Sequence, residues 1–146
     1  NFGLHLRPPP PPLTVMIGDQ YEEDLSNEYP LAMNEGSYNF QVELNRPLQD
    51  GEYLDVRVTV DLPGYESWAN LEEVDPSGWM YLDSRNGTTR TFSLKVHDDG
   101  TPGQIFGDPN LAGWWWGDIC FDIYHDDPNV EKSWCNMIDF IDMSSP

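Results

Sequence analysis

The chain has 146 residues, enough for one domain with a sizeable core and short appended segments, but not for two domains. Its 26 acidic residues outnumber its 7 basic ones, and the resulting formal charge of −19 would repel the phosphate backbone of a nucleic acid. No stretch approaches the roughly 18 to 20 apolar residues of a membrane-spanning helix. We therefore expect neither nucleic-acid binding nor insertion into a membrane.

A run of five prolines, residues 8–12, marks the N-terminal segment. Such a run forms an extended polyproline II rod, roughly 16 Å long at about 3.1 Å per residue. We interpret residues 1–12 as a stiff linker, and a ligand for an aromatic-lined groove is the alternative. Residues 144–146 resemble the start of a second linker, so residues 13–143 are expected to be one folded domain of a tandem array. Because the chain begins at Asn1 without an initiator methionine or signal peptide, we expect a fragment or a processed piece.

Two segments in the first half of the chain, residues 37–44 and 53–62, alternate apolar and polar side chains. A period of two gives each strand one dry face and one wet face. The inward-facing residues are Tyr38, Phe40, Val42 and Leu44 in the first segment, and Leu54, Val56, Val58, Val60 and Leu62 in the second. The polar residues between them allow either antiparallel neighbours in one sheet or a crossing between two sheets.

Five further segments are predicted as strands, at residues 13–17, 79–82, 89–96, 118–124 and 134–143. Between them, Asn86-Gly87 is a tight-turn signal. Residues 65–78 are expected to form an irregular connection in which Trp68, Leu71 and Val74 pack as a flap or a short helical turn. About seven strands separated by turn signals predict an all-β fold, an immunoglobulin-like antiparallel β-sandwich.

The two cysteines, Cys120 and Cys135, provide an internal test of this arrangement. The apolar residues of the penultimate strand share one face and leave Cys120 on the other; they are Ile119, Phe121 and Ile123. If Cys120 lies opposite Cys135 in an antiparallel hairpin, Ile138 and Phe140 fall on that same apolar face. We therefore predict a Cys120–Cys135 disulfide on the outer face of the hairpin. Two free thiols or a metal-binding pair are the alternatives.

The sequon Asn86-Gly87-Thr88 makes Asn86 a candidate glycosylation site. Glycosylation and disulfide formation both belong to a secretory, oxidising compartment. We expect the protein to be extracellular or at the cell surface.

Three acidic clusters fall in predicted loops: Asp19 with Glu22, Glu23 and Asp24; Asp98 with Asp99; and Asp126 with Asp127. Loops converge at the ends of a sandwich, where carboxylates from separate loops can supply the six to eight oxygens that calcium prefers. No EF-hand loop is present, so a site would be assembled from distant segments. The alternatives are that these aspartates form turns, and that the acidic charge as a whole is a solvated surface.

Residues 34–47, with Val56-Arg-Val-Thr-Val60 and residues 91–100, resemble the Calx-beta and related immunoglobulin-like repeats of extracellular arrays. Those repeats share an opening of Glu-Gly, a strand, Leu-x-x-Pro and a second strand, and later an alternating strand that ends in Asp-Asp. The resemblance covers residues 35–100. It implies a β-sandwich repeat that binds calcium through Glu35, Asp98 and Asp99. Together with Asp126 and Asp127 of the third acidic cluster, these residues are the candidate calcium ligands.

The segment Gly113-Trp114-Trp115-Trp116-Gly117 carries three successive tryptophans. Successive residues of an extended chain point to opposite faces, so at least one ring is expected outside the core. Such rings can plug the open edge of the sandwich, contact another protein or bind a sugar, and the sequence leaves all three open.

Catalysis is not expected, because the three histidines are scattered and no nucleophile or zinc-protease motif occurs. The leading hypothesis is an extracellular structural or interaction repeat of a filament, adhesin or cell-surface glycoprotein. It would assemble with neighbouring copies or other extracellular glycoproteins through exposed tryptophans and acidic, calcium-binding loops. The alternative is a carbohydrate-binding module in which Trp114, Trp115 and Trp116 bind a polysaccharide.

Overall fold

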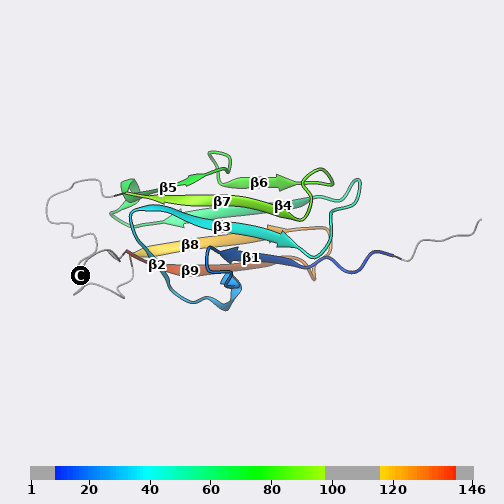
Figure 1. Ribbon diagram of the computed structural model, residues 1–146, viewed down its shortest axis with the longest axis horizontal. Coiled ribbons are helices and arrows are strands. Elements are labelled where there is room, and N and C mark those ends of the chain that lie inside the picture. Colours follow the sequence, from blue (N-terminus) through cyan, green and yellow to red (C-terminus); the bar gives the residue numbers. More distant parts are fainter. Residues whose placement is uncertain (1–8, 98–115, 141–146) are drawn as a thin grey trace, which may run out of the picture.

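The computed structural model describes residues 9–97 and 116–140, which form two β-sheets packed face to face (Figure 1). The four-stranded sheet has the order β1-β3-β7-β5, with β1 at Val15–Asp19, β3 at Gly36–Leu44, β7 at Thr89–Val96 and β5 at Ala69–Glu72. The five-stranded sheet has the order β2-β9-β8-β4-β6, with β2 at Leu31–Met33, β9 at Lys132–Phe140, β8 at Gly117–Tyr124, β4 at Leu54–Asp61 and β6 at Trp79–Leu82. Two short 3₁₀ helices are η1 at Leu25–Asn27 and η2 at Glu66–Trp68.

The all-β, two-layer prediction is confirmed, but the described residues hold nine strands and not seven. The two strands that the sequence analysis missed, β2 and β5, have three and four residues. The strand β2 has too few residues for an alternation to stand out, and β5 lies within residues 65–78, which were expected to form an irregular connection. The strands β3 and β4 lie in different sheets, so the chain crosses between layers after β3. All strand pairs are antiparallel except β2 with β9.

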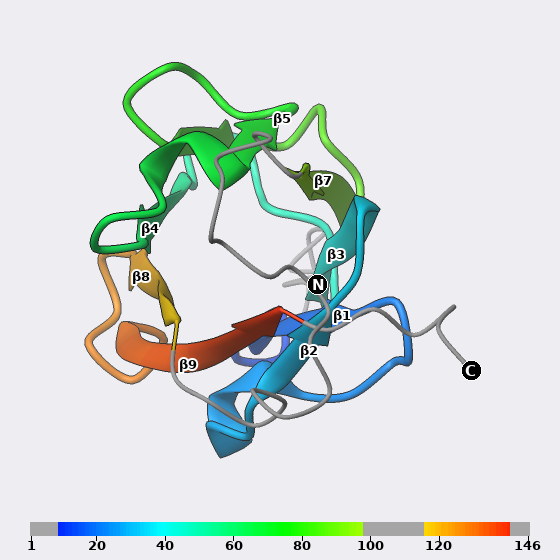
Figure 2. The same cartoon turned by 90° about the vertical axis from the view of Figure 1, so that its left-hand side faces the viewer.

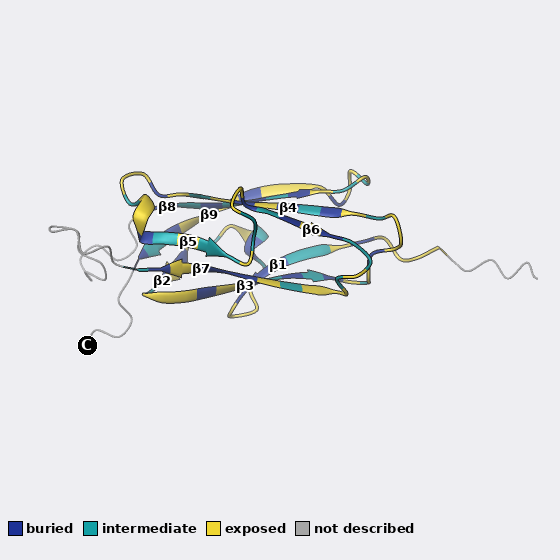
Figure 3. Ribbon diagram, turned by 90° about the horizontal axis from the view of Figure 1, so that it is seen from above, coloured by how far each residue is buried: buried dark blue, intermediate teal, exposed yellow. Residues whose placement is uncertain are grey.

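The predicted alternation places the core between the two sheets, and buried and exposed residues alternate along the strands (Figure 3). Phe40 of β3 stacks on Phe92 of β7, with ring centroids 4.9 Å apart. Phe121 of the opposite sheet lies 6.0 Å from Phe40, which joins the two layers through aromatic contacts. Viewed along the strands (Figure 2), the sheets enclose this core, and β5 of one sheet lies close to β4 of the other.

The disulfide prediction is confirmed. Cys120 of β8 lies opposite Cys135 of β9, and the two are bonded, with Cα atoms 4.0 Å apart. Ile138 and Phe140 are buried on the inner face, as the predicted register required. By chain entropy alone, a loop of this length stabilises the fold by about 3 kcal/mol.

Gly78, which directly precedes β6, lies against the backbone of β4. The N–H of Val58 donates to the carbonyl oxygen of Gly78 at 2.8 Å. Gly78 has a φ of +89°, and a Cβ atom at this position would collide with the carbonyl oxygen of Val58. Asp75 fixes the preceding turn, since its Oδ1 accepts hydrogen bonds from the N–H groups of Ser77 and Trp79, each at 2.9 Å. Only glycine fits at this point, and it positions the start of β6.

Replacing Gly78 with alanine should therefore destabilise the fold more than the same substitution at a glycine that has a positive φ but open space around it. Gly64→Ala is the matched control, because Gly64 has a φ of +83° but open space around its Cα. We expect Gly78→Ala to lower the free energy of unfolding by about 1–3 kcal/mol more than Gly64→Ala, in urea unfolding followed by circular dichroism. Equal losses in the two variants would contradict the close approach of β6 to β4.

Candidate functional site

Exposed aromatic rings gather on the outer face of the five-stranded sheet. Among the described residues, Tyr53 is 63% exposed, Tyr81 60% and Tyr124 44%. Tyr81 and the half-buried Trp79 lie on β6, Tyr124 ends β8, and Tyr53 directly precedes β4. Met80 and Leu82 of β6 are buried, so the alternation of a strand directs Trp79 and Tyr81 outward.

The strand register arranges these side chains in two rows across β6, β4 and β8. In the first row Asp55 lies between Tyr81 and Tyr124, and in the second row Arg57 lies between Trp79 and Asp122. We call these six residues the aromatic face: Trp79, Tyr81, Asp55, Arg57, Tyr124 and Asp122. The face combines flat apolar rings with one guanidinium donor and two carboxylate acceptors.

The rings of the aromatic face touch one another. Trp79 lies parallel to Tyr81 with ring centroids 5.9 Å apart, and it lies 5.5 Å from Tyr124. The guanidinium of Arg57 lies 5.6 Å from the centroid of the Trp79 ring, a cation–π contact. These contacts hold the rings as one surface.

Asp55 is half-buried between the two tyrosines, and burial raises the pKa of its carboxyl above the usual 3.8. Asp122 accepts a hydrogen bond from the hydroxyl of Ser133 at 2.6 Å. The hydrogen bond from Ser133 holds the Asp122 carboxylate, and the alternation of the strands directs both carboxylates outward.

A cavity of about 240 Å³ opens at one end of the aromatic face. It is lined by Tyr53, Asp55, Tyr124, His125, Asp126 and Glu131. Two of these residues, Asp55 and Tyr124, also belong to the aromatic face, so the cavity continues that surface.

An ion-pair network fixes the two loops that carry the walls of this cavity. Glu52 forms a bidentate pair with Arg46, at 2.7 and 3.0 Å, and accepts from Nε2 of His125 at 2.8 Å. Nδ1 of His125 accepts the N–H of Asp127 at 2.9 Å, so the ring proton lies on Nε2. Because Tyr53 follows Glu52 and Tyr124 precedes His125, the network sets the positions of both tyrosines.

The Arg46 guanidinium lowers the pKa of Glu52 from 4.5 to about 2, with further help from the Gln49 N–H and from His125. A carboxyl with a lowered folded-state pKa adds stability that is present above its unfolded pKa and lost on acidification. We expect the melting temperature to fall between pH 4.5 and about 2 partly through Glu52. In Glu52→Gln, this part of the acid dependence should disappear.

The control is Glu28→Gln, which removes the carboxylate of an exposed residue that takes no part in the ion pairs of this network. Thermal melts across this pH range should show the wild-type slope in Glu28→Gln and a shallower slope in Glu52→Gln. If the melting temperature depended on pH equally in both variants, the lowered pKa of Glu52 would not contribute to the acid sensitivity of the fold.

The Trp-rich segment is only partly described, because Trp114 and Trp115 lie outside the described residues. Trp116 is 9% exposed, and its ring packs 4.8 Å from Tyr65, 6.4 Å from Trp68 and 6.2 Å from Phe140. The burial of Trp116 fits the first alternative, in which a ring of this segment plugs the sandwich, whereas the roles of Trp114 and Trp115 stay predictions. A ring this buried offers no face for a sugar to stack on.

Of the five candidate calcium ligands, the three that the structure describes are not brought together. Glu35 precedes β3 at one end of the sandwich, whereas Asp126 and Asp127 follow β8 at the opposite end (Figure 1). Asp98 and Asp99 lie outside the described residues. Asp127 forms a turn, since its Oδ1 accepts the N–H of Asn129 at 2.9 Å. Within residues 9–97 and 116–140, no three acidic, histidine or cysteine side chains are grouped to hold a metal ion, and calcium binding stays a prediction.

Asn86 lies in the turn between β6 and β7. Its side chain is half-buried, and its Oδ1 accepts the N–H of Asp83 at 2.8 Å. The turn predicted at Asn86-Gly87 is present, with Gly87 at a φ of +70°. Glycosylation of Asn86 stays a prediction.

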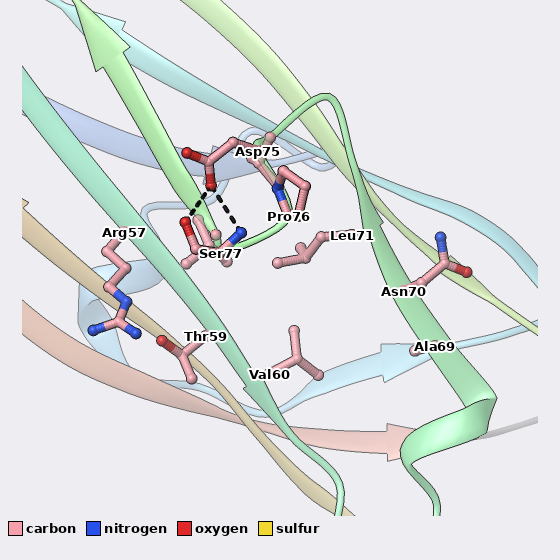
Figure 4. A pocket seen from close by; sticks show the side chains of 12 residues that line it. Arg57, Thr59, Val60, Ala69, Asn70, Leu71, Asp75, Pro76 and Ser77 are labelled. Atoms are coloured by element: carbon pink, nitrogen blue, oxygen red, sulfur yellow. Dashed lines mark hydrogen bonds between the residues drawn. The ribbon is translucent and has the colours of Figure 1, made fainter.

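A larger cavity, of about 500 Å³, lies between β4 and β5 where the two sheets approach each other (Figure 4). Val60 of β4 and Leu71 of β5 lie on either side of it, and Arg57 of the aromatic face lies at its border. The cavity therefore adjoins the aromatic face on the side of β4.

The aromatic face was not found from the sequence, although one signal for it was present. Trp79 and Tyr81 alternate with Met80 and Leu82, and assigning the aliphatic pair to the core sends both rings outward. The pairing with Tyr124 could not be found in this way, because it depends on the order β6-β4-β8.

The chain matches no protein-family model, and no curated protein is significantly similar to it. No helix among the described residues has the length and apolar character needed to cross a bilayer.

Proposed function

We propose that this domain is an extracellular carbohydrate-binding module that holds a polysaccharide on the aromatic face. The observation that most strongly supports this proposal is the two rows of rings and polar groups on β6, β4 and β8. The apolar C–H face of a sugar ring stacks on aromatic rings, and its hydroxyls bond to nearby carboxylate and guanidinium groups. A surface on paired strands keeps these groups in place, as a binding site requires.

The kind of exposed apolar residue favours a sugar over a purely apolar partner. Of the five large apolar side chains exposed among the described residues, four are tyrosines and one is Met137. A protein-binding surface usually has a dry apolar centre with few charges. Here each ring of the face has a charged neighbour on β4, which suits a ligand covered with hydroxyls.

Two features support the extracellular setting and the immunoglobulin-like assignment. The Cys120–Cys135 disulfide fits an oxidising compartment. The orders β1-β3-β7-β5 and β9-β8-β4-β6 correspond to the ABED and GFCC′ sheets of immunoglobulin domains. The chain departs from that plan in two respects, because β5 precedes β6 and the disulfide joins neighbouring strands of one sheet.

The direct test is binding to a panel of soluble oligosaccharides by isothermal titration calorimetry. Tyr81→Ala should weaken binding about fivefold, because one lost stacking contact is worth on the order of 1 kcal/mol. Trp79→Ala should weaken it at least as much, since the Trp79 ring also contacts Tyr81, Tyr124 and Arg57.

Tyr21→Ala is the matched control, because Tyr21 is also 60% exposed but follows β1 on the other sheet. It should bind as the wild type does. Equal losses in Tyr21→Ala and Tyr81→Ala, or unchanged binding in all variants, would exclude the aromatic face as the sugar site.

The second candidate is the structural and interaction repeat, and the free edge of β4 favours it. The strand β6 covers β4 only over residues 54–57, and the last bond on that side joins Val58 to Gly78. In a strand, the backbone groups of every second residue point toward the same neighbouring strand. The N–H and C=O of Val60 therefore point to the side of β6, as those of Val58 do. Within the part of the chain that the structure describes, no strand pairs with β4 there. An unpaired edge can accept a strand from a neighbouring protein.

Sedimentation equilibrium distinguishes the two candidates. A repeat that docks on its own copies should gain mass with concentration, and calcium would strengthen the contact by neutralising acidic loops. A carbohydrate-binding module should stay monomeric at every concentration, with and without a chelator.

A further inference from the structure

The outer face of the five-stranded sheet is acidic as well as aromatic. The charged residues at outward-facing positions of β4, β8 and β9 are Asp55, Asp61, Asp118, Asp122, Asp139 and Arg57. Five carboxylates therefore share this face with one guanidinium. Two of them, Asp61 and Asp118, lie directly opposite each other on paired strands, where like charges destabilise a sheet.

The outer face of the four-stranded sheet is much less acidic. Strands β3, β7 and β5 present mostly neutral polar residues outward, such as Asn39, Gln41 and Thr91. The charged residues among their outward positions are Glu43, Glu72 and Lys95. Three of the four exposed tyrosines among the described residues and most sheet carboxylates thus lie on the same face, although the chain as a whole is acidic.

The carboxylates also lie within the rows of rings. Asp55 separates Tyr81 from Tyr124, and Asp122 follows Arg57 in the second row. At the end of the face, Asp126 and Glu131 line the cavity beside Tyr53. A neutral sugar needs acceptors but no net negative charge, whereas here the Asp55 carboxylate lies between Tyr81 and Tyr124. The neighbour of Trp79 on β4 is the Arg57 guanidinium, so the negative charge of the face is concentrated beside the two tyrosines and at the end of the second row.

From this charge complementarity we infer that the ligand is a polysaccharide carrying free amino groups, a polymer of glucosamine type. Its ring faces stack on Trp79, Tyr81 and Tyr124, and its ammonium groups lie against Asp55 and Asp122. This inference rests on the proposed function and specifies the ligand of the same site. The carboxylates are spread along the sheet, and among the described residues they form no group suited to a metal ion.

The test compares two oligosaccharides of equal length in calorimetry at pH 6 and low salt, the glucosamine hexamer and its fully N-acetylated counterpart. Acetylation removes the charge but keeps the sugar ring. The glucosamine hexamer should bind about tenfold more tightly, because each exposed ion pair adds only a modest gain. The difference should shrink as salt is added.

Two double variants of equal charge separate a local site from general attraction to an acidic protein. Asp55→Asn with Asp122→Asn should abolish the preference for the free amine. Glu43→Gln with Glu72→Gln, on the other sheet, should keep it. Equal effects of the two double variants would mean that the overall charge of −19 is responsible, and would overturn the inference.

The remaining outcomes are also decisive. Equal binding of both hexamers would overturn the inference and leave the proposed function standing. Binding of neither hexamer would also overturn the inference, and the proposed function would fail only if no sugar of the oligosaccharide panel bound. Polylysine of matched charge serves as a competitor. If polylysine displaces the bound glucosamine hexamer from the protein as effectively as an excess of unbound hexamer does, the face recognises basic polypeptides. The assignment of an amino sugar then fails.

Discussion

The antiparallel register between β4 and β8 is the constraint on which the rest of the structure depends. It places Val58 opposite Phe121 in the core and Asp55 opposite Tyr124 on the outer face. A shift of one residue would send every apolar side chain of β4 into solvent and its charges into the core. The register of β6 on the other side of β4 places Tyr81 opposite Asp55 as well, so Tyr81 lies level with Tyr124. The core and the candidate site are therefore two faces of one pairing.

Neighbouring contacts hold this pairing in place. The disulfide joins β8 to β9, and buried Asn136 of β9 donates to the carbonyl oxygens of Leu25 and Tyr29, at 2.9 and 3.1 Å. Asn136 also accepts from the indole N–H of Trp134, so each of these bonds involves a fully buried amide. The Arg46–Glu52–His125 network performs a similar task at the end of the sandwich that carries the cavity. The strands that carry the aromatic face are thus held by the disulfide and the Asn136 hydrogen bonds on β9, and by the ion-pair network at the end that carries the cavity.

Local patterns in the sequence were sufficient for the parts of the fold that have a strong period. The alternation from Tyr38 to Leu44 predicted β3, and the parity of Cys120 and Ile119 predicted the last hairpin and its disulfide. The rest depends on contacts between distant segments. Nothing near Trp116 indicates that Trp68 and Phe140 will bury it, and nothing near Trp79 indicates that Tyr124 will lie beside it. The candidate site was missed for this reason, because it is formed by three strands that are far apart in the chain.

The central claim is that a ligand lies on the aromatic face and not on the Trp-rich segment. The indole N–H signals of the six tryptophans report on this directly in a two-dimensional NMR titration with the glucosamine hexamer. The account predicts that the Trp79 signal shifts on saturation, whereas the signals of the buried Trp68, Trp116 and Trp134 stay in place. Shifts confined to the Trp114–Trp116 segment, with the Trp79 signal unchanged, would contradict it.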